Sequence, residues 1–167
     1  MTARQETCCF TGHRPTKLPW RYQEQDVRCL KLKARIADTI EAVYADGYRH
    51  FLCGMAQGCD LYFCEAVIAF REKHPDVTIE AVIPCPTQAD RWPEKERLRY
   101  AALVAACDTE TLVSAQYSSG CMQRRDRYMV DHASLLIAAF DGSAGGTRYT
   151  VEYAIKREVS VLDIDIP

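Results

Sequence analysis

Short apolar stretches alternate with helical patterns from one end of the chain to the other. The apolar stretches predict six strands, at residues 7–11, 49–53, 77–83, 109–114, 134–140 and 159–166. The segments between them repeat apolar residues every three or four positions and predict helices at 24–46, 60–70, 94–106, 122–132 and 147–157. Because the links are short, this alternation predicts an α/β fold with a mostly parallel, doubly wound sheet of about six strands and helices on both faces.

Seven of the eight glycines follow an apolar stretch and precede a helical pattern. Glycine lets backbone N–H groups approach a ligand closely, and the N-terminus of a helix attracts anions. In an open parallel sheet, the carboxyl ends of the strands meet in one crevice. The glycines therefore predict an anion-binding crevice at that edge, suited to a nucleotide-like or phosphorylated ligand.

Composition limits the classes of partner. The 167 residues suit a single domain over residues 1–167, and the formal net charge of −2 supplies no basic field, so a nucleic-acid partner is not expected. The longest apolar run, Leu135–Phe140, is too short to span a bilayer, and the N-terminal segment lacks the apolar core of a signal peptide. We expect a cytoplasmic protein without a membrane partner. An exposed apolar helix face would support a homodimer.

The chain has nine cysteines, an odd number that argues against a disulfide framework in such a protein. No Cys-x-x-Cys pair occurs, and Cys53, Cys59 and Cys64 have the wrong spacing for a zinc site. We therefore expect small buried hydrophobes rather than metal or redox chemistry, with Cys8 and Cys9 facing opposite sides of a strand. No metal or cofactor is predicted, and no glycine motif matches the dinucleotide fingerprint.

The first glycine loop contains Gly12, His13, Arg14 and Lys17. Arg14 and Lys17 place cations beside a strand end, as a phosphate site requires. Arg14 should be extended because Pro15 follows it. His13 fits two roles equally well, as a hydrogen-bonded structural residue or as a base.

Two further loops offer ligand contacts. Gly54 and Gly58 would let the chain pass close to a ligand, and Asp60 would either cap the next helix or hydrogen-bond a ribose or base. In the last loop, Gly145 and Gly146 permit a nest of N–H groups, unless they simply form a tight turn. Thr147 could cap the following helix and offer its hydroxyl to a phosphate.

Two helices carry charged candidates. Arg124, Arg125 and Arg127 crowd one short helix, where the simple interpretation is a solvated face and where helical spacing lets only some of them point toward the crevice. Glu152 lies in the helix after the double glycine and is a candidate general acid or base, although most helix glutamates face solvent.

Five segments, taken together and in order, resemble the SLOG superfamily, and its small single-domain YpsA-like branch in particular. They are Cys8–Pro15, Gly54–Asp60, Val82–Pro86, Gly120–Asp131 and Asp141–Thr147. The superfamily includes the DNA-processing protein DprA and the LOG phosphoribohydrolases. The resemblance implies a Rossmann-like fold with a nucleotide-type ligand over the strand ends.

The resemblance also assigns roles to residues. Gly54, Gly58 and Asp60 look like a DprA-type element, Arg125 aligns with the functional arginine of LOG enzymes, and 145–147 look like their second glycine loop. LOG enzymes carry a catalytic glutamate three residues after the threonine, where this chain has Thr150 and places Glu152 two residues later.

Three functions follow for testing. The first is the binding or sensing of a nucleotide or nucleotide derivative. The alternative is LOG-like hydrolysis of the N-glycosidic bond of a nucleoside monophosphate, with Arg125 and Glu152 as candidate catalytic residues, so whether the chain is an enzyme stays open. DprA-like binding of single-stranded DNA is the least favoured, since only the three arginines of one helix support it.

Overall fold

The computed structural model describes residues 3–167, so Met1 and Thr2 of the predicted 1–167 domain lie outside it. Six strands form the sheet: β1 Thr7–Gly12, β2 His50–Cys53, β3 Thr78–Ile83, β4 Thr109–Leu112, β5 Leu135–Ala139 and β6 Ser160–Ile164. Five α-helices connect them: α1 Val27–Ala45, α2 Cys59–Arg71, α3 Glu94–Ala106, α4 Cys121–Asp131 and α5 Gly146–Lys156. Two short 3₁₀ helices, Arg4–Glu6 and Pro15–Lys17, flank β1.

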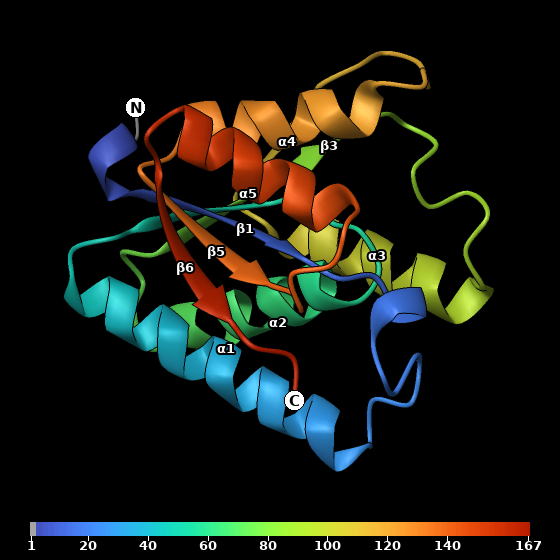
Figure 1. The fold of residues 1–167 in the computed structure, drawn as a ribbon, viewed down its shortest axis with the longest axis horizontal. Helices are drawn as coiled ribbons and strands as arrows, with labels where there is room; N and C mark the ends of the chain where they lie inside the picture. Colours follow the sequence, from blue (N-terminus) through green and yellow to red (C-terminus); the bar gives the residue numbers. More distant parts are fainter. Residues whose placement is uncertain (1–2) are drawn as a thin grey trace.

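The sheet confirms the predicted fold class. All neighbouring strands pair in parallel, in the order β4-β3-β2-β1-β5-β6. Helices α1, α2 and α3 pack on one face, and α4 and α5 pack on the other (Figure 1). None of the helices within residues 3–167 is long and apolar enough to cross a membrane.

The strand order creates a switch point between β1 and β5. From β1 the chain winds outward through β2 and β3 to β4, and then crosses back to β5 on the other side of β1. The connections after β1 and β5 therefore leave in opposite directions and open a crevice at the carboxyl ends of these two strands, where open α/β sheets bind their ligands.

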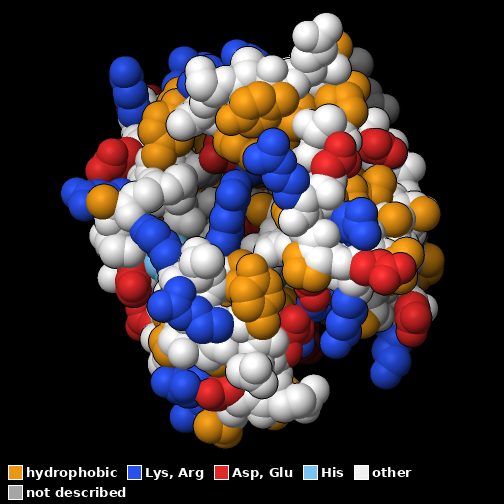
Figure 2. Space-filling view, turned by 90° about the vertical axis from the view of Figure 1, so that its right-hand side faces the viewer, with side chains coloured by type: hydrophobic (Ala, Val, Ile, Leu, Met, Phe, Trp, Pro, Cys, Tyr) orange, Lys and Arg blue, Asp and Glu red, His pale blue; other side chains and the backbone are white. Residues whose placement is uncertain are grey.

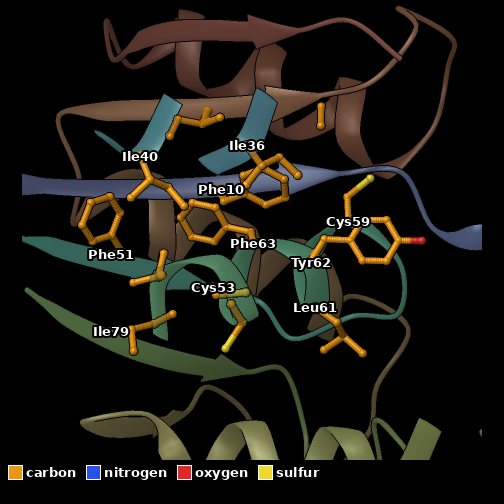
Figure 3. Packing of buried hydrophobic residues seen from close by; sticks show 14 of the residues in the cluster. Phe10, Ile36, Ile40, Phe51, Cys53, Cys59, Leu61, Tyr62, Phe63 and Ile79 are labelled. Carbon is orange, nitrogen blue, oxygen red and sulfur yellow. The ribbon is translucent and has the colours of Figure 1, made fainter. Parts of the chain in front are cut away.

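Alternating side chains build a separate core on each face of the sheet. On β1, Cys8 and Phe10 join the core under α1 and α2, whereas Cys9 joins the core under α4 and α5, as the adjacent cysteines predict. Figure 3 shows the first core, in which the rings of Phe10 and Phe63 stack with centroids 4.4 Å apart. The ring centroid of Phe51, on β2, lies 6.0 Å from that of Phe63. The side chain of Phe63, on α2, therefore contacts both β1 and β2.

Helix α1 begins three residues later than the periodicity predicts. The Asp26 carboxylate accepts the N–H of Arg28 at 2.9 Å and caps the helix there, so residues 24–26 stay outside it.

Eight of the nine cysteines are buried, in agreement with the prediction of small buried hydrophobes, and Cys107 is the partly exposed exception.

Candidate functional site

A cavity of about 310 Å³ opens at the switch point, above the carboxyl ends of β1 and β5. This volume lies at the lower end of the range for small-molecule sites. Figure 2 shows the face toward which β1 points, where Lys and Arg side chains gather around a hollow. The lining residues are Phe10, Thr11, Gly12, His13, Arg14, Thr16, Lys17, Ala56, Asp60, Met122, Gln123, Arg125, Asp126, Met129, Gly146 and Thr147.

His13 fastens the first loop to its neighbours. Its N–H donates to the carbonyl of Ala139 at 3.0 Å, and its carbonyl accepts the N–H of Cys59 at 3.1 Å. The buried imidazole places Nε2 2.9 Å from a carboxylate oxygen of Asp141. Hydrogen bonds from Ser143 and His13 hold the pKa of Asp141 well below its usual range. The geometry therefore favours a structural role for His13, at the wall of the cavity.

The cations of the first loop stand at the mouth of the cavity. Arg14 is extended, with φ −78° and ψ 163°, as its position before proline predicts. Within residues 3–167, its side chain makes no ion pair. The Lys17 ammonium donates to the carbonyl of Ala144 and approaches the Ser143 hydroxyl at 3.4 Å, so it bridges the first and last loops. Both cations are within reach of an anion in the cavity.

Arg125 brings a buried positive charge to the floor of the cavity. Its side chain is only 4% exposed. Nε donates to Asp126 at 2.6 Å, and Nη1 donates to the carbonyl of Gly54. Burial opposes the charge, but the carboxylates of Asp126 and Asp60 outweigh it and raise the pKa of Arg125. Thr150 donates to the second oxygen of Asp126 at 3.0 Å, so a fixed network orients the guanidinium.

Helix spacing explains why this arginine, among the three in α4, turns inward. Cys121, Arg125 and Met129 are four residues apart and form the buried face of the helix. Arg124 is exposed and donates to the hydroxyls of Ser114 and Ser118 instead. The position of Arg125 is thus set by its two buried neighbours on the helix.

Gly54 and Gly58 lie behind the cavity wall and do not line it. A Cβ on Gly54 would lie 2.6 Å from Nη1 of Arg125, so glycine makes room for the guanidinium. Gly58 has φ +85°, and a Cβ there would lie 2.7 Å from the carbonyl oxygen of His13. In the structure, both glycines therefore permit contacts between protein groups.

Asp60 contributes a buried carboxyl group to the wall. It lies in the first turn of α2, and its Oδ2 accepts the N–H of Ala56 at 3.0 Å. Burial raises the pKa of Asp60 to about 6, although Arg125 and the Ala56 hydrogen bond oppose the shift. The N-cap position of α2 is Gly58, so Asp60 does not cap the helix in the way that the sequence suggests. Its carboxyl group titrates close to neutral pH beside the cavity.

The N-terminus of α5 forms the opposite wall. Gly145 occupies the N-cap position and supplies no capping side chain. Gly146 and Thr147 line the cavity, and Thr147 is buried. The first N–H groups of α5 are thus left without a side-chain cap beside the cavity, which suits an anionic group.

The structure therefore brings together eight of the twelve predicted site residues: Gly12, His13, Arg14, Lys17, Asp60, Arg125, Gly146 and Thr147. Gly54 and Gly58 lie behind these, and Gly145 is exposed at the start of α5 and does not line the cavity. Glu152 lies away from the cavity on the exposed side of α5, with a carboxylate oxygen 3.0 Å from Nε of Arg148. Sequence reasoning missed Asp126, Met122 and Met129, although the spacing of buried residues in α4 carries that signal.

Comparisons with known proteins agree with this architecture. The YpsA family model, described as the YspA SLOG family, matches residues 8–165. The chain belongs to this family. The predicted resemblance to the SLOG superfamily is thereby confirmed.

Among its relatives, an uncharacterized SPbeta prophage-derived protein, YoqJ of Bacillus subtilis, is 29% identical over 140 residues, which cover 76% of this chain and 82% of that protein. A UPF0398 protein of Bacillus licheniformis is 25% identical over 139 residues, which cover 82% of this chain and 75% of that protein.

Two solved structures share the fold. DprA from Streptococcus pneumoniae superposes with a TM-score of 0.62 at 15% identity, covering 95% of this chain and 50% of that one. DprA from Helicobacter pylori, which is described as having a unique single-stranded DNA binding mode, gives a TM-score of 0.62 at 13% identity, covering 96% of this chain and 65% of that one. This chain thus spans half to two-thirds of the DprA chains.

Proposed function

We propose that the chain binds a nucleotide or a phosphorylated nucleotide derivative in the cavity between β1 and β5. The observation that carries the proposal is that Arg14 and Lys17 of the first loop and Arg125 of α4 line one cavity together with the N-terminus of α5. Cations and free N–H groups are what a phosphate needs, and a phosphate is the group that nucleotides share.

Different residues of the cavity would contact the phosphate and the nucleoside part of such a ligand. Lys17, Gly146 and Thr147 surround the N-terminus of α5 and would hold the phosphate. Asp60, on the other wall, would hydrogen-bond a ribose hydroxyl or the base, as an acceptor when ionised and as a donor when protonated.

A thermal-shift panel tests the proposal, with AMP, CMP, ADP-ribose, NAD and cyclic dinucleotides as probes. A ligand at 100 times its dissociation constant should add about 2.7 kcal/mol and raise the melting temperature by roughly 5–11 °C. A chain that none of these compounds stabilises would contradict the proposal.

The variant Gly146→Tyr tests whether the ligand binds in this cavity. A Cβ on Gly146 meets no atom within 4 Å, so the substitution is compatible with the fold and fills the cavity. We expect it to abolish the shift. Arg148→Tyr adds the same ring to an exposed position of α5 outside the cavity and should leave the shift intact. Equal binding by both variants would move the ligand elsewhere.

Hydrolysis of an N-glycosidic bond is the second candidate, and Asp60 favours it. A carboxyl group with a pKa of about 6 is suited to general acid–base catalysis, and it shares the cavity with Arg125. Glu152 is outside the cavity, so we assign the acid–base role to Asp60. Release of ribose 5-phosphate from nucleoside monophosphates should be lost in Asp60→Asn and kept in Glu152→Gln. No release above the Asp60→Asn background would remove this candidate.

Single-stranded DNA is not the ligand that we propose. The formal net charge of −2 gives little long-range attraction for a polyanion. Among the α4 arginines, Arg125 is buried in its ion pair, and Arg127 donates to the Tyr149 hydroxyl at 2.7 Å. A compact anionic ligand fits the cavity lined by Arg14, Lys17 and Arg125 better.

A further inference from the structure

Two cysteines far apart in the sequence lie side by side where α2 passes the end of α3. The sulfur of Cys64, on α2, is 3.8 Å from the sulfur of Cys107, the residue that follows α3. Cys64 is fully buried, whereas Cys107 alone among the nine cysteines reaches the surface. A disulfide requires about 2.05 Å between sulfurs, so a small movement of two side chains would bring the pair into bonding range.

The surroundings give the two thiols different roles. A hydrogen bond from Cys64, aided by the charge of Arg71, lowers the pKa of Cys107. The Arg71 guanidinium is fixed beside this residue, since it donates to the carbonyl of Ala106 at 2.8 Å and to Asp108 at 2.6 Å. The same contact with Cys107 raises the pKa of Cys64. Cys107 is therefore the accessible thiol and the one that ionises more readily, and Cys64 is the thiol behind it.

The position of a third cysteine, Cys53, keeps its sulfur from being the first to meet an oxidant. Cys53 also neighbours Cys64, but it is fully buried, and its thiol donates to the carbonyl of Asp60 at 3.2 Å. An oxidant in solution meets Cys107 first.

We propose that Cys107 and Cys64 form an oxidation site, at which hydrogen peroxide converts the two thiols into a disulfide. The Cys107 thiolate attacks one peroxide oxygen, the O–O bond breaks, and the leaving hydroxide takes up a proton to become water. Cys64 then attacks the sulfur of the resulting sulfenic acid. The S–O bond breaks, and the hydroxyl leaves as water with the Cys64 proton. Two thiols and one peroxide give one disulfide and two waters, and the bond ties α2 to the junction of α3 and β4.

The sequence allows a clean mapping experiment. Cleavage before aspartate releases residues 60–75, in which Cys64 is the only cysteine, and residues 90–107, in which Cys107 is the only cysteine. The reduced, folded protein is treated with a small excess of hydrogen peroxide, denatured in N-ethylmaleimide and digested. We expect these two peptides to be joined, and the intact protein to lose two hydrogens and two alkylatable thiols.

Matched variants separate the steps. Cys85→Ser changes another buried cysteine, whose sulfur lies 3.6 Å from the Thr87 hydroxyl, and should leave the link intact. Cys64→Ser, with Cys64→Ala as a second variant in case serine unfolds the chain, should stop at a sulfenic acid on Cys107 that dimedone traps. Cys107→Ser should abolish both products. A different linked pair, or a Cys107 that peroxide leaves unmodified in the folded wild-type protein, would overturn the proposal.

Discussion

The two ends of the parallel strands hold a carboxyl group in opposite ways, with Glu80 partly buried at the amino ends and Asp60 buried at the carboxyl ends. At the amino edge, Glu80 accepts hydrogen bonds from Thr111 at 3.0 Å and Tyr128 at 3.2 Å, and its other oxygen lies 3.3 Å from Nε2 of His50. These partners, His50 first, lower the pKa of Glu80. At the carboxyl edge, Asp60 has the N–H of Ala56 as its hydrogen-bond donor within residues 3–167, and burial raises its pKa to about 6.

The difference separates polar groups that are bonded within the fold from polar groups that would contact the ligand that we propose. The protein satisfies Glu80 with its own side chains, although a cavity of about 280 Å³ lies beside it. Around the other cavity, the carboxyl group of Asp60, the charge of Arg14 and the first N–H groups of α5 keep unused hydrogen-bonding capacity. Of these groups, Asp60 is buried, so its sparse hydrogen bonding costs stability, and hydrogen bonds from the ligand that we propose would offset this cost.

The largest effect should come from breaking the network of Arg125, Asp126 and Thr150 at the carboxyl ends of the strands. Arg125→Ala leaves the carboxylate of Asp126 buried without its partner, so we expect a loss of about 3–5 kcal/mol. The melting temperature should fall by roughly 6–20 °C in thermal denaturation. Arg124→Ala, one residue away but exposed, should change stability by no more than about 0.5 kcal/mol. Similar losses in both would mean that the buried pair has no special role.

The pH dependence of stability sharpens the comparison. The pKa of Asp60 is higher in the folded chain than its ordinary value of 3.8, so the stability that the protonated carboxyl group contributes is lost as pH rises from about 4 to about 6, by about 3 kcal/mol at most. The pKa of Glu80 is lowered, so its contribution is present at neutral pH and is lost as pH falls below its usual value. Urea denaturation across this range should show that Asp60→Asn removes the fall toward neutral pH, and that Glu80→Gln lowers stability at neutral pH. Changes of the same sign in both variants would contradict the comparison.

The smallest effect should come from a cation at the mouth. Lys17→Ala removes a charge that contacts the Ala144 carbonyl but anchors no buried group. We expect stability to change by less than about 0.5 kcal/mol and nucleotide affinity to fall about tenfold, or about 1.4 kcal/mol. Calorimetric titration measures the nucleotide affinity. The control is Lys31→Ala, which removes an equal charge from the exposed side of α1. Equal affinities in the two variants would take Lys17 out of the site.

Periodicity was sufficient to predict the strands, the helices and the parallel sheet, because each element carries its own apolar pattern. It could not predict the strand order, since six strands with similar buried faces can be arranged in several ways. The glycines illustrate the same limit within the site. Their position after predicted strands indicated that seven of the eight lie near one end of the sheet, but the part played by Gly54 depends on Arg125, which is distant in sequence. The orientation of Glu152 likewise depends on which face of α5 packs on the sheet.

His13 has a consequence for how the empty cavity moves. Through its N–H and its ring, His13 joins the first loop to the end of β5 and to the loop at Asp141. Through its carbonyl, it joins the first loop to the start of α2, so one residue connects three loops. Opening any one of them strains the other two, and their fluctuations are therefore coupled. A molecule that immobilises one loop would reduce the fluctuations of all three. Binding in the cavity would therefore also reduce the fluctuations of amides that the ligand does not contact.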